Sequence, residues 1–265
     1  MTAPSPRRRA LVTGGSAGMG YAAAEALAAA GCHVAIAARS PNRLAEAADR
    51  LRSVAAPGAR IETLVWDLED REVTARTVGI LVEAGDGPPD ILVHVAGGPP
   101  LFVPGEEDEE TFRRFLESHS FSLWAAMRAF APAMQARGFG RIISVTSRAM
   151  GEPRADNPLS AAIRLPAWAM MKSYARSGRF PAVTFNAVLP GLFDTNRFAD
   201  VTESLARSEG RTRDAVEARF LSAVPAGRLG RPAELGSLCA WLASDLGGYV
   251  NGQRIVIDGG SSAGL

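Results

Sequence analysis

Long apolar runs are absent from this 265-residue sequence. No stretch of about 18 apolar residues occurs, which excludes a membrane-spanning helix. The apolar residues that follow the basic cluster at 6–9 are too few for a signal peptide. We therefore expect a cytoplasmic protein without a membrane partner, in which residues 1–8 form a flexible tail.

Cysteine and one-sided charge are also scarce. The two cysteines, Cys32 and Cys239, lie in apolar surroundings and form no CxxC pair, so we expect two buried thiols in a reducing compartment and no metal site. The 29 basic and 28 acidic residues are interspersed and give a net charge of +1. A nucleic-acid-binding protein concentrates basic residues on one face, so no nucleic-acid partner is expected.

What the sequence does contain is a regular alternation of short apolar runs and helix-like stretches. Near-continuous apolar strands separated by helices are typical of a parallel sheet with helices on both faces. A length of 265 residues and a hydrophobic content of 47% suit one such domain over residues 1–265. We predict an α/β fold with a doubly wound parallel sheet of about seven strands, at 9–13, 33–38, 61–66, 90–95, 141–146, 182–188 and 254–259.

The longest stretch without a predicted strand, residues 190–253, is more polar at 194–218. Connections of this length are uncommon in compact domains and often cover a functional site. We therefore interpret residues 191–225 as a lid over a substrate.

A glycine-rich turn, "TGGSAGMG" at 13–20, follows the first predicted strand and opens an alanine-rich helix. Gly14 permits a tight turn, Gly18 lets the backbone approach a pyrophosphate, and Gly20 allows close helix–strand packing. The amino terminus of the helix adds amide donors and a favourable dipole for phosphate. At the first strand–helix junction, this motif indicates a dinucleotide site.

The second predicted strand ends in "AARS" at 37–40. Sites that prefer NAD usually place an acidic residue here to hold the ribose 2′-hydroxyl, whereas an arginine accommodates a 2′-phosphate. This chain has Arg39 and no carboxylate nearby in the sequence. We favour NADP(H) as the cofactor, against the alternative that Arg39 is a solvated side chain at a turn.

The order and spacing of these motifs, together with "WDL" (66–68), "HVAGG" (94–98), "SVTS" (144–147) and "PGLFDT" (190–195), resemble those of the short-chain dehydrogenase/reductases from Thr13 to Gly260. The resemblance implies a Rossmann-type fold that binds a dinucleotide. It also implies cofactor contacts from a set of matching positions: Gly14, Ser16, Gly18, Met19, Gly20, Asp67, Leu68, Ala96, Gly97, Pro190, Gly191 and Thr195.

In that family a serine, a Tyr-x-x-x-Lys pair and a helical asparagine form the catalytic apparatus. The tyrosine exchanges the proton, the lysine holds the ribose and lowers the tyrosine pKa, and the serine polarises the carbonyl. Carried over, Ser147 fits the serine, but Ser160 stands at the tyrosine position, Arg164 at the lysine position and His119 at the asparagine position. The resemblance therefore identifies a divergent member with an atypical active site.

These replacements change which groups can move a proton. Arg164 keeps a positive charge that could hold the ribose or a phosphate, but a guanidinium pKa above about 12 prevents proton relay. The hydroxyl of Ser160 is a much weaker acid than a phenol, whose pKa is about 10. His119 is a candidate proton donor, and the alternative is a histidine hydrogen-bonded between helices. Arg148 and Arg154 are either surface residues or contacts for an anionic substrate.

Three functions remain open. The leading one is an NADP(H)-dependent oxidoreductase that reduces a carbonyl, or a related C=N or C=C bond, of a small substrate with an atypical proton donor. The alternatives are a catalytically silent dinucleotide-binding regulatory or structural protein, and a non-redox enzyme built on the same pocket. The resemblance also implies a homodimer or homotetramer, with the helices around 107–137 and 158–177 and the C-terminal strand at the interfaces.

Overall fold

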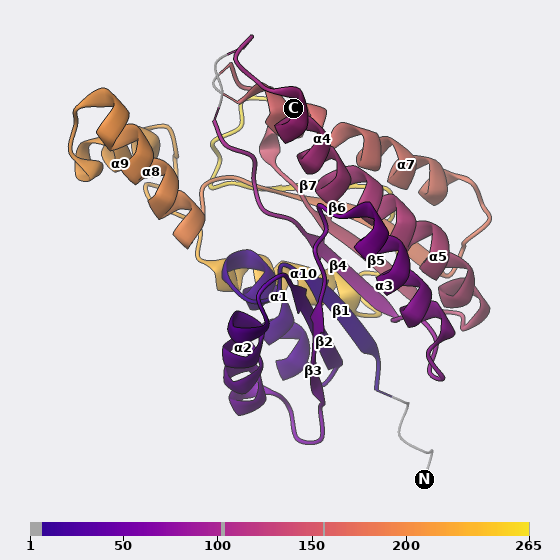
Figure 1. The fold of residues 1–265 in the computed structure, drawn as a ribbon. Helices are drawn as coiled ribbons and strands as arrows, with labels where there is room; N and C mark the ends of the chain where they lie inside the picture. The colour runs from indigo at the N-terminus through magenta and orange to yellow at the C-terminus, as the bar shows by residue number, and fades with distance from the viewer. Residues whose placement is uncertain (1–6, 102–103, 156, 265) are drawn as a thin grey trace.

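The computed structural model describes residues 7–101, 104–155 and 157–264, and these contain one parallel sheet of seven strands (Figure 1). The strand order is β3-β2-β1-β4-β5-β6-β7, so the chain reverses direction across the sheet between β1 and β4. Ligands of such sheets bind at the carboxyl ends of the strands beside this reversal. Every strand lies within two residues of its predicted bounds: β1 Arg9–Thr13, β2 His33–Ala38, β3 Ile61–Val65, β4 Ile91–Val95, β5 Gly140–Val145, β6 Val183–Pro190 and β7 Arg254–Ile257.

Helices cover both faces of the sheet, which confirms the predicted doubly wound α/β fold (Figure 1). One face carries α1 (Gly18–Ala29), α2 (Pro41–Val54) and α10 (Pro232–Ala243). The other carries α3 (Arg71–Glu83), α5 (Ser122–Ala136) and α7 (Leu165–Arg176). The remaining helical elements are α4 (Glu109–Leu116), η1 (Glu117–Phe121), η2 (Arg148–Met150), α6 (Pro158–Ala162), α8 (Asn196–Glu209) and α9 (Arg213–Ser222).

The two helical layers form two apolar cores because successive strand residues point to opposite faces. On the central strand β1, Val12 packs in the core that includes Leu27 of α1. Its neighbour Leu11 packs in the core that includes Phe130 of α5. All four side chains are at most 1% exposed, and each such burial stabilises the fold by about 1.5–3 kcal/mol. This double burial explains why the strands read as continuous apolar runs.

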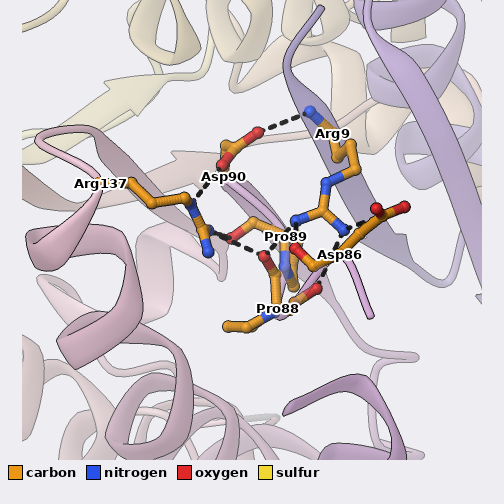
Figure 2. Close-up of polar contacts among 7 residues, drawn as sticks. Arg9, Asp86, Pro88, Pro89, Asp90 and Arg137 are labelled. Carbon is orange, nitrogen blue, oxygen red and sulfur yellow. Dashed lines mark hydrogen bonds and ion pairs between the residues drawn. The ribbon is translucent and has the colours of Figure 1, made fainter. Parts of the chain in front are cut away.

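A polar cluster fixes the amino ends of β1 and β4 (Figure 2). The carboxylate of Asp90 accepts a hydrogen bond from the backbone N–H of Arg9 (2.9 Å) and another from Arg137 Nε (3.0 Å). The guanidinium of Arg9 donates to the carbonyl oxygens of Gly87 (3.0 Å) and Pro88 (2.9 Å). The loop before β4 is therefore tied to β1 and α5, and the opposite, carboxyl ends of the strands carry the candidate site.

Over the segment 158–177 the sequence predicts one helix, kinked at Pro166 because a proline inside a helix removes a backbone hydrogen bond, and the observed segment differs. It forms two helices, because α6 ends at Ala162 and α7 begins at Leu165 with Pro166 in its first turn. A first-turn residue needs no backbone N–H donor, so proline fits there without a lost hydrogen bond. Arg164 becomes the residue that precedes α7.

The helix expected around 107–137 is also interrupted. A π-helical turn, η1, separates α4 from α5, and its residues Ser118, His119 and Ser120 are buried. Such turns occur within α-helices and are frequent at functional sites. The turn brings His119 toward the loop that follows β4, where its ring contacts Gly97.

The interpreted lid, residues 191–225, contains α8 and α9, which project from one side of the sheet as a helical pair (Figure 1). The rings of Phe198 and Phe220 join the pair edge to face at 5.9 Å between centroids. Of the expected tail 1–8, residues 1–6 lie outside the described residues. Arg8 is described and pairs with Asp245 at 2.6 Å.

The two cysteines are free thiols, and only Cys239 is fully buried. Cys32 is half-buried, so the expectation of two buried thiols is correct for one of them. In the described part of the chain, no helix combines the length and the apolar character that crossing a bilayer requires.

Candidate active site

Two adjoining cavities follow the carboxyl ends of the strands. One, of about 260 Å³, lies beside the glycine-rich turn, and the other, of about 230 Å³, lies beyond β4 and β5. Val95 and Ala96, at the end of β4, line both. The cavities therefore meet where the strand order reverses.

The glycine-rich turn has the backbone geometry that a close phosphate contact requires. Gly14 and Gly18 have φ values of +60° and +55°, which side chains disfavour. A Cβ on Gly20 would lie 2.3 Å from the carbonyl oxygen of Gly14, so only glycine allows α1 to begin this close to β1. Ala17 at the start of α1 provides no side-chain cap. The first amides of α1 therefore have no side-chain acceptor at the N-cap.

Charged side chains surround the far end of the first cavity. Arg39 and Arg43 line it together with Asp67 and Glu69. Arg39 Nη1 lies 3.6 Å from Glu69 Oε1, and the arginine side chain remains 66% exposed. Glu69 also accepts a hydrogen bond from Arg114 Nε at 3.0 Å, so two cations share its charge. The sequence reasoning missed Glu69 and Arg43 because no motif marks them; folding alone brings Glu69 next to Arg39.

The structure divides the predicted cofactor residues between the cavities. Gly18 and Gly20 line neither cavity, although a Cβ on Gly18 would lie 3.5 Å from Thr195 Cγ2. The first cavity is lined by Gly14, Ser16, Arg39, Asp67, Leu68, Ala96 and Gly97. The second is lined by Met19, Ala96, Arg164, Pro190, Gly191 and Thr195.

Three of the four predicted catalytic residues meet in the second cavity: Ser147, Ser160 and Arg164. Ser147 follows β5, and its Oγ accepts from the N–H of Ala149 at 3.2 Å. Ser160 Oγ lies 3.5 Å from Ser147 Oγ. Arg164 Nη1 donates to the carbonyl oxygen of Ser160 at 2.7 Å and to its Oγ at 3.0 Å. The Oγ of Ser160 accepts from arginine and donates its own hydrogen to Ser147 Oγ, and a ligand oxygen could receive that hydrogen in place of Ser147.

Arg164 is a buried cation. Arg164 is only 6% exposed, and its Nε has no hydrogen-bond partner among the described residues. Burial lowers the pKa of Arg164 to about 10, and the charge of Arg197 acts in the same direction. The guanidinium is still protonated at neutral pH. The one lysine of the sequence, Lys172, donates to Gly252 at 2.6 Å and does not line this cavity.

His119 does not line either cavity. Its Nε2 lies 2.8 Å from the carbonyl oxygen of Gly97 and donates to it, since a carbonyl only accepts. Burial, with the nearby charge of Arg164, holds the pKa of His119 well below its usual value. A neutral ring that shares its proton with a backbone carbonyl favours the structural interpretation over that of a proton donor.

His94 is also a neutral, hydrogen-bonded side chain. Its Nε2 lies 2.9 Å from Ser122 Oγ, which itself donates to Ser118 at 2.7 Å. Burial lowers the pKa of His94 to about 4. His94 therefore joins β4 to α5 without carrying charge.

Two further residues of the second cavity were not found from the sequence. Arg197 of α8 lines it and donates through Nη2 to the carbonyl oxygen of Pro99. Asn157, just before α6, also lines it, and its Oδ1 is buried without a partner. Neither belongs to a recognisable motif. Arg148 and Arg154, considered above for an anionic substrate, line this cavity and a neighbouring one of about 570 Å³ against α8 and α9.

Comparison with known proteins identifies the family. Residues 14–262 match the family model described as Enoyl-(Acyl carrier protein) reductase. This chain belongs to the short-chain dehydrogenase/reductases. It is 33% identical over 253 residues to the 3-oxoacyl-[acyl-carrier-protein] reductase FabG of Escherichia coli (strain K12), covering 95% of this chain and 96% of that protein.

Other short-chain dehydrogenase/reductases match over a similar extent. Nodulation protein G of Azospirillum brasilense is 32% identical over 251 residues, which cover 95% of this chain and 96% of that protein. The crystal structure of L-sorbose reductase from Gluconobacter frateurii, complexed with NADPH and L-sorbose, is 27% identical, with a TM-score of 0.89 and coverage of 98% of each chain. The resemblance inferred from the motifs is thus confirmed at the level of family and fold.

Proposed function

We propose that this chain is an NADP(H)-dependent oxidoreductase that reduces a carbonyl, or a related C=N or C=C bond, of a small substrate at an atypical active site. The observation that carries the proposal is the meeting of Ser147, Ser160 and Arg164 in a cavity that adjoins the glycine-rich turn. Relatives named as reductases, and one named as complexed with NADPH, support it.

The first cavity fits the adenosine and phosphate portions of a dinucleotide. The positive φ of Gly14 and Gly18 and the uncapped amides of α1 suit a pyrophosphate. Asp67 and Leu68 would hold the adenine, and Arg39 with Arg43 would hold a 2′-phosphate. Ala96, Gly97, Pro190, Gly191 and Thr195 would lie along the rest of the cofactor. When bound, NADPH supplies a hydride.

The chain's own residues would then act on the substrate oxygen. Ser147 and Ser160 donate hydrogen bonds to it, and Arg164 places its charge 3.0 Å behind the hydroxyl of Ser160. Donors fixed before the reaction stabilise negative charge as it develops on the oxygen. Ser160 and Arg164 are both poor acids near neutral pH, and His119 is neutral and outside the cavity. We propose that the oxygen takes its proton from water, and that α8 and α9 act as the lid.

The residues that line the second cavity also support a second candidate function, that of a dinucleotide-binding protein without catalysis. None of the described residues that line the second cavity is a tyrosine, lysine, histidine or carboxylic acid, the groups that usually exchange protons. Loss of a positioned acid lowers rates by roughly 10²–10⁴-fold. The retained Ser147 and the polarised Ser160 favour the oxidoreductase, because a binding protein does not require them.

Titration of NADPH fluorescence, followed by a screen of carbonyl, imine and enone substrates for cofactor oxidation, tests the proposal. We expect saturable NADPH binding and oxidation with at least one substrate class. Binding without oxidation across all three classes would favour the silent protein. Absence of NADPH binding would contradict both candidates.

A further inference from the structure

The second cavity has a one-sided charge. Among the described residues that line it, four are arginines and none is aspartate or glutamate. The arginines come from three places: Arg148 and Arg154 from the loop after β5, Arg164 from the α6–α7 junction and Arg197 from α8. The first cavity, by contrast, contains carboxylates beside its arginines. Arg148 is paired with Glu152 at 3.7 Å, so the positive charge that a ligand of the second cavity meets is assigned to Arg164 and Arg197.

Arg164 differs from an ordinary surface arginine in what surrounds it, whereas Arg197 is exposed and lies near the opposing charge of Asp200. Arg164 makes its hydrogen bonds to Ser160 alone, has an unpartnered buried Nε and pairs with no carboxylate of the described chain. Arg197 donates to the carbonyl oxygen of Pro99. Burial is the main cause that lowers the pKa of each, and the charge of Arg197 further lowers that of Arg164. The buried charge of Arg164 and the charge of Arg197 repel each other, and an anion between them would relieve this repulsion and the desolvation of Arg164.

The position of Arg164 limits where that anion lies on the substrate. Its guanidinium is 3.0 Å from the Ser160 hydroxyl, which would contact the reacting oxygen. The anionic group must therefore lie close to the reacting carbonyl. A planar guanidinium binds a carboxylate through two parallel hydrogen bonds, so a carboxylate matches two arginines well. A cavity of about 230 Å³ accommodates a small acid.

We propose that the substrate is a small 2-oxo or 3-oxo acid whose carboxylate is bound by Arg164 and Arg197. The proposal rests on the proposed function for the reaction itself, but the binding of the carboxylate does not require turnover. Arg197 is the informative position, because it lies on α8, outside the residues that would contact the reacting oxygen. It would act as a specificity-determining residue rather than as part of the proton chemistry.

Matched neutral and charged substrates test the proposal with the full-length chain. NADPH oxidation is measured with 2-oxobutanoate, 3-oxobutanoate and their methyl esters. We expect kcat/KM to be higher for at least one acid than for its ester by about tenfold or more, which corresponds to the loss of one charged hydrogen bond. Arg197→Gln should raise KM for that acid by about tenfold and leave the ester unchanged. The control is Arg207→Gln, because Arg207 is exposed on the same helix and lines none of the three cavities. It should leave KM unchanged for both the acid and the ester.

Calorimetry with NADP⁺ separates this proposal from the function on which it rests. With NADP⁺ an oxo acid cannot be reduced, so its binding is measured directly, and Arg197→Gln should raise its Kd by about tenfold. If no carbonyl is reduced but this binding and its loss are found, the proposed function fails and the anion site stands. Reduction of esters and acids with equal kcat/KM would overturn the anion site alone. If Arg197→Gln weakens the binding of NADP(H) and not that of the oxo acid, the anion site is overturned as well. Arg197 would then be assigned to the cofactor phosphates.

Discussion

Arg164 Nη1 lies 2.7 Å from the carbonyl oxygen of Ser160 and 3.0 Å from its hydroxyl oxygen. Ser160 lies in α6 and Arg164 in the junction that follows, because the chain leaves α6 at Ala162 and enters α7 at Leu165. The double contact holds the guanidinium against the cavity wall. The hydroxyl of Ser160 thus accepts from Arg164 and donates to Ser147 Oγ, 3.5 Å away.

Arg164→Ala should weaken binding of the substrate, the cofactor or both by about 1.5–3 kcal/mol, because a charged hydrogen bond is lost. Calorimetry with NADP(H) and KM measurements report the two effects separately. Arg176→Ala, at the exposed end of α7, provides the control and should change neither. Unchanged Kd for NADP(H) and unchanged KM in the Arg164 variant would show that Arg164 anchors neither the cofactor nor the substrate.

Ser160→Ala should leave turnover within a few-fold of the unmodified protein, because a serine hydroxyl is a poor acid and Ser147 still donates a hydrogen bond to the substrate oxygen. Ser147→Ala and His119→Ala should lower turnover further. Ser147 would lose a direct hydrogen bond to the substrate, and His119 holds the carbonyl of Gly97 at 2.8 Å beside the cofactor cavity. The ordering is measured by kcat in one assay. If Ser160→Ala abolishes turnover while NADPH binding is intact, the serine itself performs the chemistry.

NADP(H) should bind at least about tenfold, or about 1.4 kcal/mol, more tightly than NAD(H). Arg39 lines the first cavity and is exposed enough to turn from Glu69 to a 2′-phosphate. Calorimetry with both dinucleotides measures the ratio, and Arg39→Ala should reduce it. Arg52→Ala, on α2 but paired with Asp49 outside the cavity, should not. Equal affinities for the two cofactors in the unmodified chain would mean that Arg39 points to solvent.

Two exposed apolar surfaces lead us to expect a dimer or tetramer. Around the edge strand β7, Leu246 and Tyr249 are 79% and 103% exposed. On the other side, Phe121 of η1 and Met170 of α7 are 39% and 37% exposed. Stable interfaces bury about 1,200–2,000 Å², and closed symmetry makes dimers and tetramers the usual products.

Light scattering at micromolar concentration should give the mass of such an assembly. Tyr249→Asp, which would place a charge in one interface, should lower that mass. A monomeric mass for the unmodified chain would contradict the expectation.

Acid should destabilise the protein in part through His94. Its pKa is about 4 in the folded chain and about 6.5 when unfolded, so the unfolded chain binds more protons between these values. The stabilising contribution is fully present above about pH 6.5 and is lost as the pH falls toward 4, up to about 3 kcal/mol.

The contribution of His94 is measured by urea unfolding at pH 7.5 and pH 5. His94→Asn removes the titrating ring, so its free energy of unfolding should fall less between the two pH values than that of the unmodified protein. Equal pH dependence in both proteins would show that His94 is not the source. The drop measured for the variant reports the other titrating groups.

The sequence by itself determined the sheet and the position of the glycine-rich turn at the first strand–helix junction. A continuous apolar run such as 91–95 indicates a strand that is buried on both faces of a sheet. This pattern can be read from neighbouring residues in the sequence alone. Gly14 and Gly18 could be placed in the turn because their conformation is set within a few residues. The break at Pro166 was predicted only as a kink, since whether a helix bends or restarts depends on what packs around it.

Only the tertiary structure decided which charges face each other. Arg39 and Glu69 follow different strands. Arg164 lies at the α6–α7 junction and Arg197 on α8, so no spacing in the sequence relates either pair. Burial decided the rest. His119 was a candidate proton donor in the sequence, but the folded core removes water from its ring, as it does from that of His94, and holds both neutral. Charge and solvation depend on three-dimensional neighbours, and a linear pattern does not contain them.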